Sequence, residues 1–311
     1  MSSNCKRTPL SWAAGEGNNE IVMLLLKKKD VNPNIADRYG RTPLSWAARN
    51  GQDGVVKLLL GRKDVNPNTQ DICGLTPLFW AIMGRRDSRD RIVELLLGCG
   101  DVNPNIADAN SRAPLRRAAV IGSDRVVKLL LERKDVTLNI TDDLGGTALS
   151  WASKLGYEEA VKLLLRCQNV NPNIADEYSR TPLLLAATGG HHGVVQLLLE
   201  RGDANPNITD CIGKTPLSWA SESGHEELVK LLLRCQNVNP NIADKVGRTP
   251  LSWAASSGND QVVQLLLGRK DVDPNIPDND GRTPLWWASY TRKDGAARLL
   301  KARQSANPDT V

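Results

Sequence analysis

The segment GRTPLSWAARNGQDGVVKLLLGRKDVNPN, residues 40–68, carries the signals for two short helices and a turn. Gly40 favours a turn conformation that residues with side chains resist. Thr42 is a typical helix N-cap residue, and Pro43 suits the first helical position, where its missing N–H costs nothing. A glycine-containing break at Gly51 then ends this first helix.

A second helix and an extended segment follow in the same stretch. The letters VVKLLL place apolar side chains on one inner face, and Arg62 and Lys63 suit the negative end of the helix dipole. The segment DVNPN is non-helical, because proline disfavours helix in the preceding residue and Asn and Asp favour turns. Each unit therefore consists of a helix, a turn, a helix and an extended finger that ends in a tight turn.

The whole chain repeats this unit. TPLSWAA or a variant of it occurs nine times, at spacings of 34 residues except for one of 37. A fixed period in this range is typical of stacked supersecondary units. We therefore predict an all-α solenoid of about nine helix-turn-helix units with finger loops, in a single domain spanning residues 1–311. The helix pairs are expected to begin near Thr8, Thr42, Thr76, Ala113, Thr147, Thr181, Thr215, Thr249 and Thr283.

The unit resembles the ankyrin repeat over essentially the full chain. The family pattern T-P-L-H-x-A appears as TPLSWA, with Ser45 in the place of the usual His in the second copy. The style of the array is similar to the long arrays of large fungal proteins. The resemblance implies a solenoid that binds another protein on its concave surface, with no cofactor.

The two ends of the array differ. Near the C-terminus Ala296 and Ala297 replace the paired valines and Lys301 replaces the third leucine, a change typical of a capping repeat. The first copy shows no such replacement of its large apolar residues. Either another domain precedes residue 1, or that end is less protected.

Composition and cysteine usage favour a location inside the cell. The net charge of +5 is mild, and MSSNCKRTPL offers no signal peptide. The longest apolar run, near Ile21 to Leu26, is far too short to cross a membrane. We predict an intracellular, cytoplasmic monomer, with a nuclear location left open. No C-x-x-C pair occurs, and six free thiols are expected: Cys5, Cys73, Cys99, Cys167, Cys211 and Cys235.

The sequence contains no recognisable catalytic or metal site. His192 and His225 fall in the turn between the two helices, where the family pattern often carries His. There is no Ser, His and acid trio, no His pair with metal spacing and no phosphate loop, so we expect no enzyme. One aspartate per finger is expected to make a turn hydrogen bond. These residues are Asp37, Asp71, Asp108, Asp142, Asp176, Asp210, Asp244 and Asp278.

A cation stands immediately before most of the repeat starts. Either these cations pair with the finger aspartates, or they face a partner on the finger side of the concave surface. An acidic protein segment is then the expected partner, and nucleic acid is disfavoured because no aromatic residues interleave with the cations. We call this set the basic ladder: Arg7, Arg41, Arg112, Arg180, Lys214, Arg248 and Arg282.

A tryptophan recurs in the first helix of most repeats. We expect this tryptophan ladder to pack in the core between helices; an exposed surface that stacks a ligand is the alternative. Arg117 and Leu185 interrupt the ladder. Its members are Trp12, Trp46, Trp80, Trp151, Trp219, Trp253 and Trp287.

Specificity is expected where the copies differ, at the finger tips and at the ends of the first helices. These variable positions include Arg49, Ile72, Cys73, Ile212 and Tyr290. Together with the ladder they suggest a set of candidate partner-binding residues: Arg38, Tyr39, Arg41, Arg112, Arg116, Tyr178, Arg180, Lys214, Arg248 and Arg282.

The third and fourth repeats depart most from the pattern. Three additional residues near Gly84 to Asp90 are expected in the turn between the two helices. In the fourth repeat Arg116 and Arg117 replace Ser-Trp. We expect Arg117 to stack its guanidinium on Trp80 or Trp151, and Arg116 to be exposed.

The sequence thus favours a non-catalytic protein-interaction or scaffolding module. The alternative is an elastic structural spacer within a larger multidomain protein, for which no single partner would matter. An enzyme on a repeat scaffold is the least supported class, since it would need a pocket with strongly shifted titratable groups.

Overall fold

The computed structural model describes residues 6–306, which form eighteen α-helices and no β-strand. First and second helices of the repeats alternate along the chain, as the sequence predicted. The first helices are α1 (Pro9–Glu16), α3 (Pro43–Asn50), α5 (Pro77–Met83), α7 (Pro114–Val120), α9 (Ala148–Leu155), α11 (Pro182–Thr188), α13 (Pro216–Ser223), α15 (Pro250–Ser257) and α17 (Pro284–Tyr290). The second helices are α2 (Asn19–Leu26), α4 (Asp53–Leu60), α6 (Arg86–Leu97), α8 (Asp124–Leu131), α10 (Glu158–Leu165), α12 (His192–Arg201), α14 (Glu226–Arg234), α16 (Asp260–Leu267) and α18 (Asp294–Ala306).

The boundaries of the first helices follow from their capping residues. In α3 the Thr42 hydroxyl accepts the Ser45 N–H at 3.2 Å, and Pro43 takes the first helical position. Gly51 ends the helix with φ of 79°, a left-handed conformation that favours glycine. At α7 Ala113 offers no side-chain cap, yet the helix still begins at Pro114. Packing of its buried face therefore compensates for the missing cap.

The apolar core lies between the layer of first helices and the layer of second helices. Leu44 and Ala47 of α3 and Val55, Val56 and Leu59 of α4 are almost entirely buried. Burying one valine or leucine side chain contributes about 1.5–3 kcal/mol, and each repeat supplies several. Because the pattern recurs, each repeat completes the core of its neighbour.

The insertion in the third repeat does not lie where the sequence predicted. Instead of enlarging the turn, the additional residues extend α6 at its N-terminal end, so that α6 has 12 residues while α4 has 8. Asp87 in the first turn suits the positive end of the helix dipole. Arg91 also pairs with Asp53 of α4 at 2.9 Å, which ties the extended helix to its neighbour.

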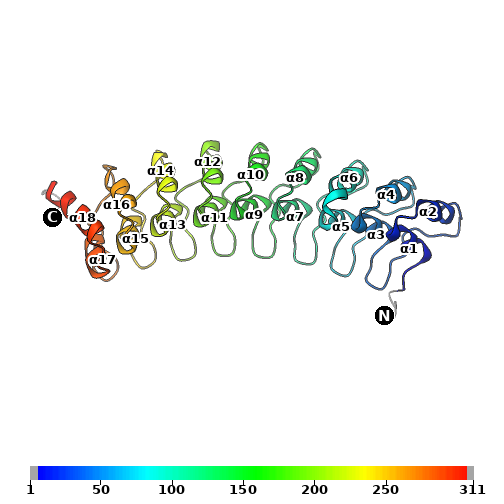
Figure 1. Cartoon of the computed structure of the whole chain (residues 1–311), viewed down its shortest axis with the longest axis horizontal. Helices are drawn as coiled ribbons and strands as arrows, with labels where there is room; N and C mark the ends of the chain where they lie inside the picture. The colour runs from blue at the N-terminus through cyan, green and yellow to red at the C-terminus, as the bar shows by residue number, and fades with distance from the viewer. Residues whose placement is uncertain (1–5, 307–311) are drawn as a thin grey trace. The chain divides into compact units, whose positions relative to one another are not determined.

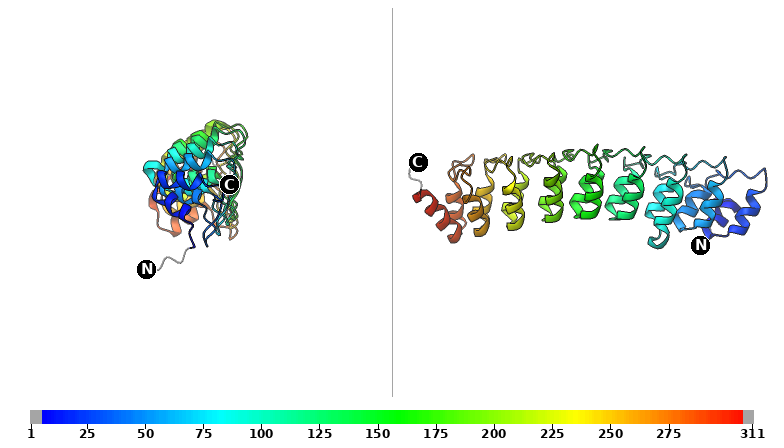
Figure 2. Two further views of the ribbon diagram at one scale, coloured as in Figure 1. Left: turned by 90° about the vertical axis from the view of Figure 1, so that its right-hand side faces the viewer. Right: turned by 90° about the horizontal axis from the view of Figure 1, so that it is seen from above.

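The helices group into two units, residues 1–148 and residues 149–311. Within each unit neighbouring first helices pack on one another and neighbouring second helices do the same, while the finger loops extend away from the second helices (Figures 1 and 2). A single domain over the full chain stays a prediction.

An asparagine ladder that the sequence analysis missed joins successive fingers. The Asn34 side chain donates to the Asp64 carbonyl at 2.6 Å and accepts the Asn66 N–H at 2.8 Å. One side chain thus satisfies two backbone groups of the next finger, which explains the recurrence of N-P-N. The same pair of bonds is made by Asn68, Asn105, Asn173, Asn207 and Asn241.

Candidate partner-binding surface

The finger aspartates make the turn hydrogen bonds that the sequence predicted. Asp37 Oδ1 accepts the backbone N–H groups of Tyr39 at 2.9 Å and Arg41 at 3.0 Å. These two bonds close the tight turn at the end of the finger. Corresponding pairs of bonds form at Asp71, Asp108, Asp142, Asp176, Asp210, Asp244 and Asp278.

The second carboxylate oxygen of these aspartates holds the tryptophan ladder in place. The Trp80 indole N–H donates to Asp71 Oδ2 at 3.0 Å, and Trp253 donates to Asp244 Oδ2 at 2.9 Å. Trp46, Trp219 and Trp287 make the same bond. In these repeats tryptophan and aspartate therefore form one unit that fixes a finger to the first helix that follows it.

Burial of the tryptophan rings is uneven. Trp80 and Trp287 are buried, as expected, whereas Trp46, Trp219 and Trp253 remain partly exposed. Trp12 is 45% exposed, so the core assignment is wrong at that position. Within the described residues Trp12 is covered by one ladder cation, Arg7, whereas Trp46, Trp253 and Trp287 each lie near two.

Most cations of the basic ladder stack on tryptophan rings. The Arg7 guanidinium carbon lies 4.4 Å from the Trp12 ring centroid and 3.3 Å from that of Trp46. Arg41 lies 5.1 Å from Trp46 and 4.8 Å from Trp80. Arg7 and Arg41 each contact the ring of the repeat that they precede and the ring of the next one. Stacking of this kind contributes about 0.5–2 kcal/mol, depending on how far the cation is desolvated.

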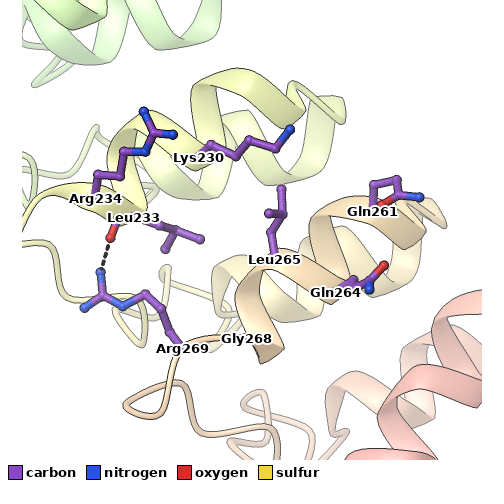
Figure 3. Close-up of a pocket in the computed structure, with 8 residues that line it drawn as sticks. All are labelled: Lys230, Leu233, Arg234, Gln261, Gln264, Leu265, Gly268 and Arg269. Carbon is purple, nitrogen blue, oxygen red and sulfur yellow. Dashed lines mark hydrogen bonds between the residues drawn. The ribbon is translucent and has the colours of Figure 1, made fainter.

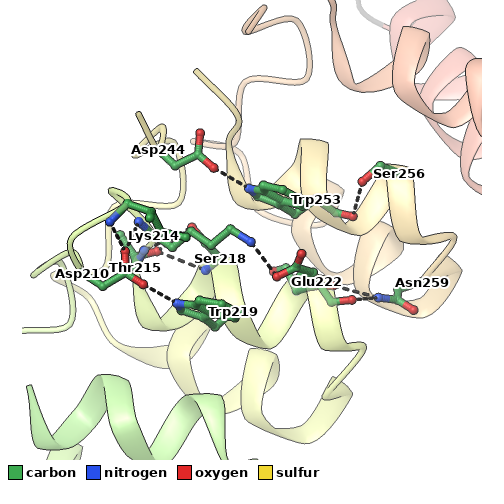
Figure 4. Close-up of polar contacts among 12 residues, drawn as sticks. Asp210, Lys214, Thr215, Ser218, Trp219, Glu222, Asp244, Trp253, Ser256 and Asn259 are labelled. Carbon is green, nitrogen blue, oxygen red and sulfur yellow. Dashed lines mark hydrogen bonds and ion pairs between the residues drawn. The ribbon is translucent and has the colours of Figure 1, made fainter. Parts of the chain in front are cut away.

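The corresponding stack in repeats seven to nine contains Lys214. Its ammonium nitrogen lies 4.4 Å from the Trp219 centroid and 3.4 Å from that of Trp253, and 2.6 Å from a Glu222 carboxylate oxygen (Figure 4). Lys214 is only 3% exposed. Its expected exposure to a partner is therefore wrong, because two rings and a carboxylate enclose the ammonium group. Arg248 stacks similarly on Trp253 and Trp287, at 4.7 and 3.5 Å.

Pairing of ladder cations with finger aspartates was the other expectation, and a cation hydrogen-bonds to the aspartate of its own finger where the tryptophan is missing. In the fourth repeat Arg112 Nε donates to Asp108 Oδ2 at 2.7 Å. In the sixth repeat Arg180 Nε donates to Asp176 Oδ2 at 2.9 Å. Without an indole donor, the aspartate oxygen takes the arginine of its own finger.

The two arginines of the fourth repeat are placed differently from what the sequence predicted. Arg116 is buried, and its guanidinium lies 2.8 Å from Asp142 of the following finger. Burial lowers the pKa of Arg116, while the Asp142 charge opposes that shift. The expected exposure of Arg116 is wrong, because its position faces the next finger. Among the described residues Arg117 stacks on neither Trp80 nor Trp151, so that expectation is wrong; it lines a pocket with Leu75 and Phe79 instead.

The finger tips carry exposed apolar side chains at corresponding positions. Tyr178, Ile212 and Val246 are 48%, 46% and 54% exposed and occupy three successive fingers. The carbonyl of each accepts a backbone N–H from the next finger, at 2.8, 3.0 and 3.1 Å. These bonds hold the three side chains at regular intervals along one edge. We call this set the tip row; Val246 was missed because nothing in the sequence distinguishes an exposed finger valine from a buried one.

The tip of the second finger is polar and aromatic. The Arg38 guanidinium donates to the Tyr39 hydroxyl and lies 4.5 Å from its ring centroid. Arg38 is exposed and Tyr39 is partly exposed. Both residues are thus available at the surface, as the sequence suggested.

A shallow groove lies on the second-helix side, between α14 and α16. It encloses about 500 Å³, and Leu233 and Leu265 lie between Lys230, Arg234 and Arg269 (Figure 3). Arg269 donates to the Leu233 carbonyl at 2.9 Å and pairs with Asp271.

Among residues 6–306 no group of three or more His, Cys, Asp or Glu side chains could hold a metal ion.

A sequence model described as "Ankyrin repeats (3 copies)" matches overlapping stretches over almost the whole chain: residues 1–71, 55–142, 78–176, 149–244 and 227–310. The chain belongs to the ankyrin-repeat family.

Solved structures agree with this family. The ankyrin repeat protein EF0377 is 26% identical, with a TM-score of 0.57, and the match covers 60% of this chain and 96% of that one. An ankyrin repeat domain, ABAYE2397, from Acinetobacter baumannii AYE is 30% identical, with a TM-score of 0.56, over 61% and 97% of the two chains. No curated protein matches the chain. The narrower resemblance to fungal arrays is not shown by these matches.

Ankyrin repeats are generic protein-interaction modules, and their fold is typically non-catalytic.

In this ankyrin array the described cysteines, which exclude Cys5, are free; Cys73 and Cys211 are exposed at finger tips. Burial raises the pKa of Cys167 and of Cys235. None of the helices that the structure describes is both long and apolar enough for a membrane span. The cytoplasmic location stays a prediction.

Proposed function

We propose that this ankyrin array is a non-catalytic protein-interaction module whose partner lies along the finger tips and the first helices. The tip row carries this proposal. Tyr178, Ile212 and Val246 are exposed apolar side chains on successive fingers, where solvation alone would favour polar residues.

The backbone between the tips makes the row a preorganised surface. The three cross-finger hydrogen bonds fix the spacing of the side chains before a partner arrives. A binding surface that is already ordered loses little conformational entropy on association. Tyr178 supplies the kind of large, amphipathic side chain that is enriched among residues dominating binding energy.

The cations beside the tips favour an acidic segment as the partner. Arg38 is exposed, and the Arg112, Arg180 and Arg282 side chains are 36%, 32% and 38% exposed. Each is already stacked or paired within the array, so an added partner carboxylate would contribute only about 0.2–1 kcal/mol per pair. In this proposal the charges orient the partner, and the tip row supplies most of the affinity.

The proposal is tested by photocrosslinking. A photoreactive phenylalanine analogue at Ile212 should crosslink a discrete protein in cell extract, and the same analogue at Gln264 of α16, an exposed residue on the second-helix side, should not. The triple variant Tyr178→Ser, Ile212→Ser, Val246→Ser should lose the partner in pull-down experiments while keeping its helix content. A partner retained at full affinity by the triple variant would refute the proposed surface.

The same experiment separates the alternative function. An elastic spacer needs stacked repeats and no partner, so neither labelled position would crosslink a discrete protein. The tip row argues against that alternative, since a spacer gains nothing from exposed apolar side chains at regular intervals.

A further inference from the structure

The pocket at the joint of the third and fourth repeats is formed by two departures from the ladder. At four other joints a cation before the repeat start, Arg7, Arg41, Lys214 or Arg248, stacks on the tryptophan of the following repeat. Here Leu75 stands in the place of the cation, and Arg117 stands in the place of that tryptophan. The space that a ring and a cation fill elsewhere is left as a pocket of about 390 Å³.

One side of this pocket is apolar. Leu75 and Phe79 are buried and form a cluster with Trp80. Ile72 and Met83 also line the pocket and are 69% and 41% exposed. Together these four side chains form a surface suited to one aliphatic or aromatic side chain.

The opposite side of the pocket carries an excess of positive charge. Arg112, Arg117 and Asp108 line it. Asp108 already accepts hydrogen bonds from two backbone N–H groups and from the Arg112 guanidinium. The negative charge of Asp108 is therefore neutralised by Arg112. The Arg117 Nε–H is enclosed and has no hydrogen-bond partner among the described residues. Arg117 forms no ion pair among residues 6–306, so the array does not neutralise its charge.

The electrostatic surroundings of Arg117 agree with that geometry. Burial lowers the pKa of Arg117, the charges of Arg112 and Arg89 add to the effect, and Asp108 only partly opposes it. A carboxylate bound in the pocket would offset the positive charge of Arg117 and accept two parallel N–H hydrogen bonds from its guanidinium.

We infer that this pocket binds an acidic side chain, aspartate or glutamate, together with a neighbouring apolar side chain of one extended segment of a partner protein. The inference rests on the proposed function and names the chemistry of one subsite. Arg117 takes the carboxylate, and Leu75, Phe79 and Met83 take the apolar group. Charge complementarity selects this occupant, because a carboxylate opposes the positive charge of Arg117, whereas a neutral segment leaves that charge uncompensated and a basic segment adds to it.

A displayed library of random peptides tests the inference. Peptides selected on the whole chain should carry an acidic residue close to an apolar one. The best peptide, synthesised with an amidated C-terminus so that only side-chain carboxylates remain, is compared with its acid-to-amide form by fluorescence anisotropy. Replacing Glu by Gln, or Asp by Asn, should weaken binding roughly tenfold or more, as expected for a lost charged hydrogen bond.

The matched protein variant is Arg117→Trp, which restores the residue found in most other repeats and should fold normally. It should bind the acidic peptide roughly tenfold more weakly, while Arg117→Lys should be intermediate because it keeps the charge without the bidentate geometry. Circular dichroism confirms that each variant is folded.

Thiol footprinting locates the bound peptide. Cys73 lines the pocket, and Cys211 is a free, exposed cysteine on the finger that precedes the seventh repeat. The peptide should slow alkylation of Cys73 and leave Cys211 unchanged. Protection of Cys211 alone would place the peptide on the tip row, which would overturn this inference and leave the proposed function standing. Failure to select any peptide, or equal binding by Arg117→Trp, also overturns it.

Discussion

Replacing a tryptophan of the ladder tests how the repeats are held together. In Trp80→Ala the chain loses a buried ring, and truncation of a large aromatic side chain in a core costs about 3–5 kcal/mol. The buried Asp71 carboxylate also loses its indole donor, at 3.0 Å, which adds about 1 kcal/mol. Arg41 and Arg49, each 4.8 Å from the ring centroid, regain water, which offsets part of this loss. We expect the free energy of unfolding to fall by about 4 kcal/mol.

Two further variants divide this cost. Trp80→Phe keeps most of the ring and removes the indole N–H, so it should cost about 1–2 kcal/mol. Trp12→Ala is the matched control, because Trp12 occupies the same place in its repeat but is 45% exposed. It should cost about 1 kcal/mol or less.

The assay is equilibrium denaturation in guanidinium chloride, followed by circular dichroism so that the loss of a fluorophore does not matter. Arrays of repeats can unfold in more than one step, so the midpoints of each step are compared. Equal midpoint shifts for Trp80→Ala and Trp12→Ala would refute the assignment of Trp80 to the core. A wild-type midpoint for Trp80→Phe would show that the bond to Asp71 contributes nothing.

Four other predictions concern the fingers, the thiols and the assembly. Asn207→Ala removes bonds of 2.7 and 2.9 Å to the next finger, and should cost about 1–2 kcal/mol by denaturation, whereas Gln236→Ala should be neutral. Burial raises the pKa of Asp108, but the hydrogen bonds from Arg112 and the turn outweigh it, so this pKa lies below its ordinary value. The stabilisation is therefore complete above about pH 4 and lost at lower pH, and Asp108→Asn should flatten the fall in unfolding free energy there. Thiol titration of the native chain should find Cys73 and Cys211 fast and Cys167 and Cys235 slow, with six thiols after unfolding; a similar rate at all four sites would contradict the burial. Sedimentation equilibrium should return the mass of one chain, and the mass of two chains would contradict the prediction of a monomer.

The positions of the helices could be predicted from the sequence because their signals are local. Thr42, Pro43 and Gly51 each act within their own turn, and the structure places them at the cap, the first position and the C-terminus of α3. The insertion at Gly84 to Asp90 was misplaced for a physical reason. Its charged residues are equally compatible with a solvated turn and with the exposed first turn of α6, so local preference could not decide.

The ladders were harder to predict because each cation has competing partners. Arg41 lies near Asp71, at 3.8 Å, as well as near the rings of Trp46 and Trp80. Sequence spacing places all of these groups within reach of one side chain, and only the three-dimensional packing ranks them. The recurrence of an Asp nine residues before every ladder Trp except Trp12 was the available signal for the indole bond.

The interruptions of the ladder show why one joint differs from the others. In the fifth and sixth repeats Gly146 and Leu185 likewise stand in the places of the cation and of the tryptophan, but Leu185 is buried and Arg180 satisfies Asp176, so this double departure is compensated. At the joint of the third and fourth repeats both the cation and the ring are replaced, by Leu75 and Arg117. Arg112 satisfies Asp108 in the same way, yet no group remains to fill the space of the ring or to accept from the Arg117 Nε–H. The difference is that a charged side chain, Arg117, takes the place of the ring here, whereas the buried apolar Leu185 takes it in the sixth repeat. A cation in the place of a framework ring is therefore the feature to look for in other arrays of this kind.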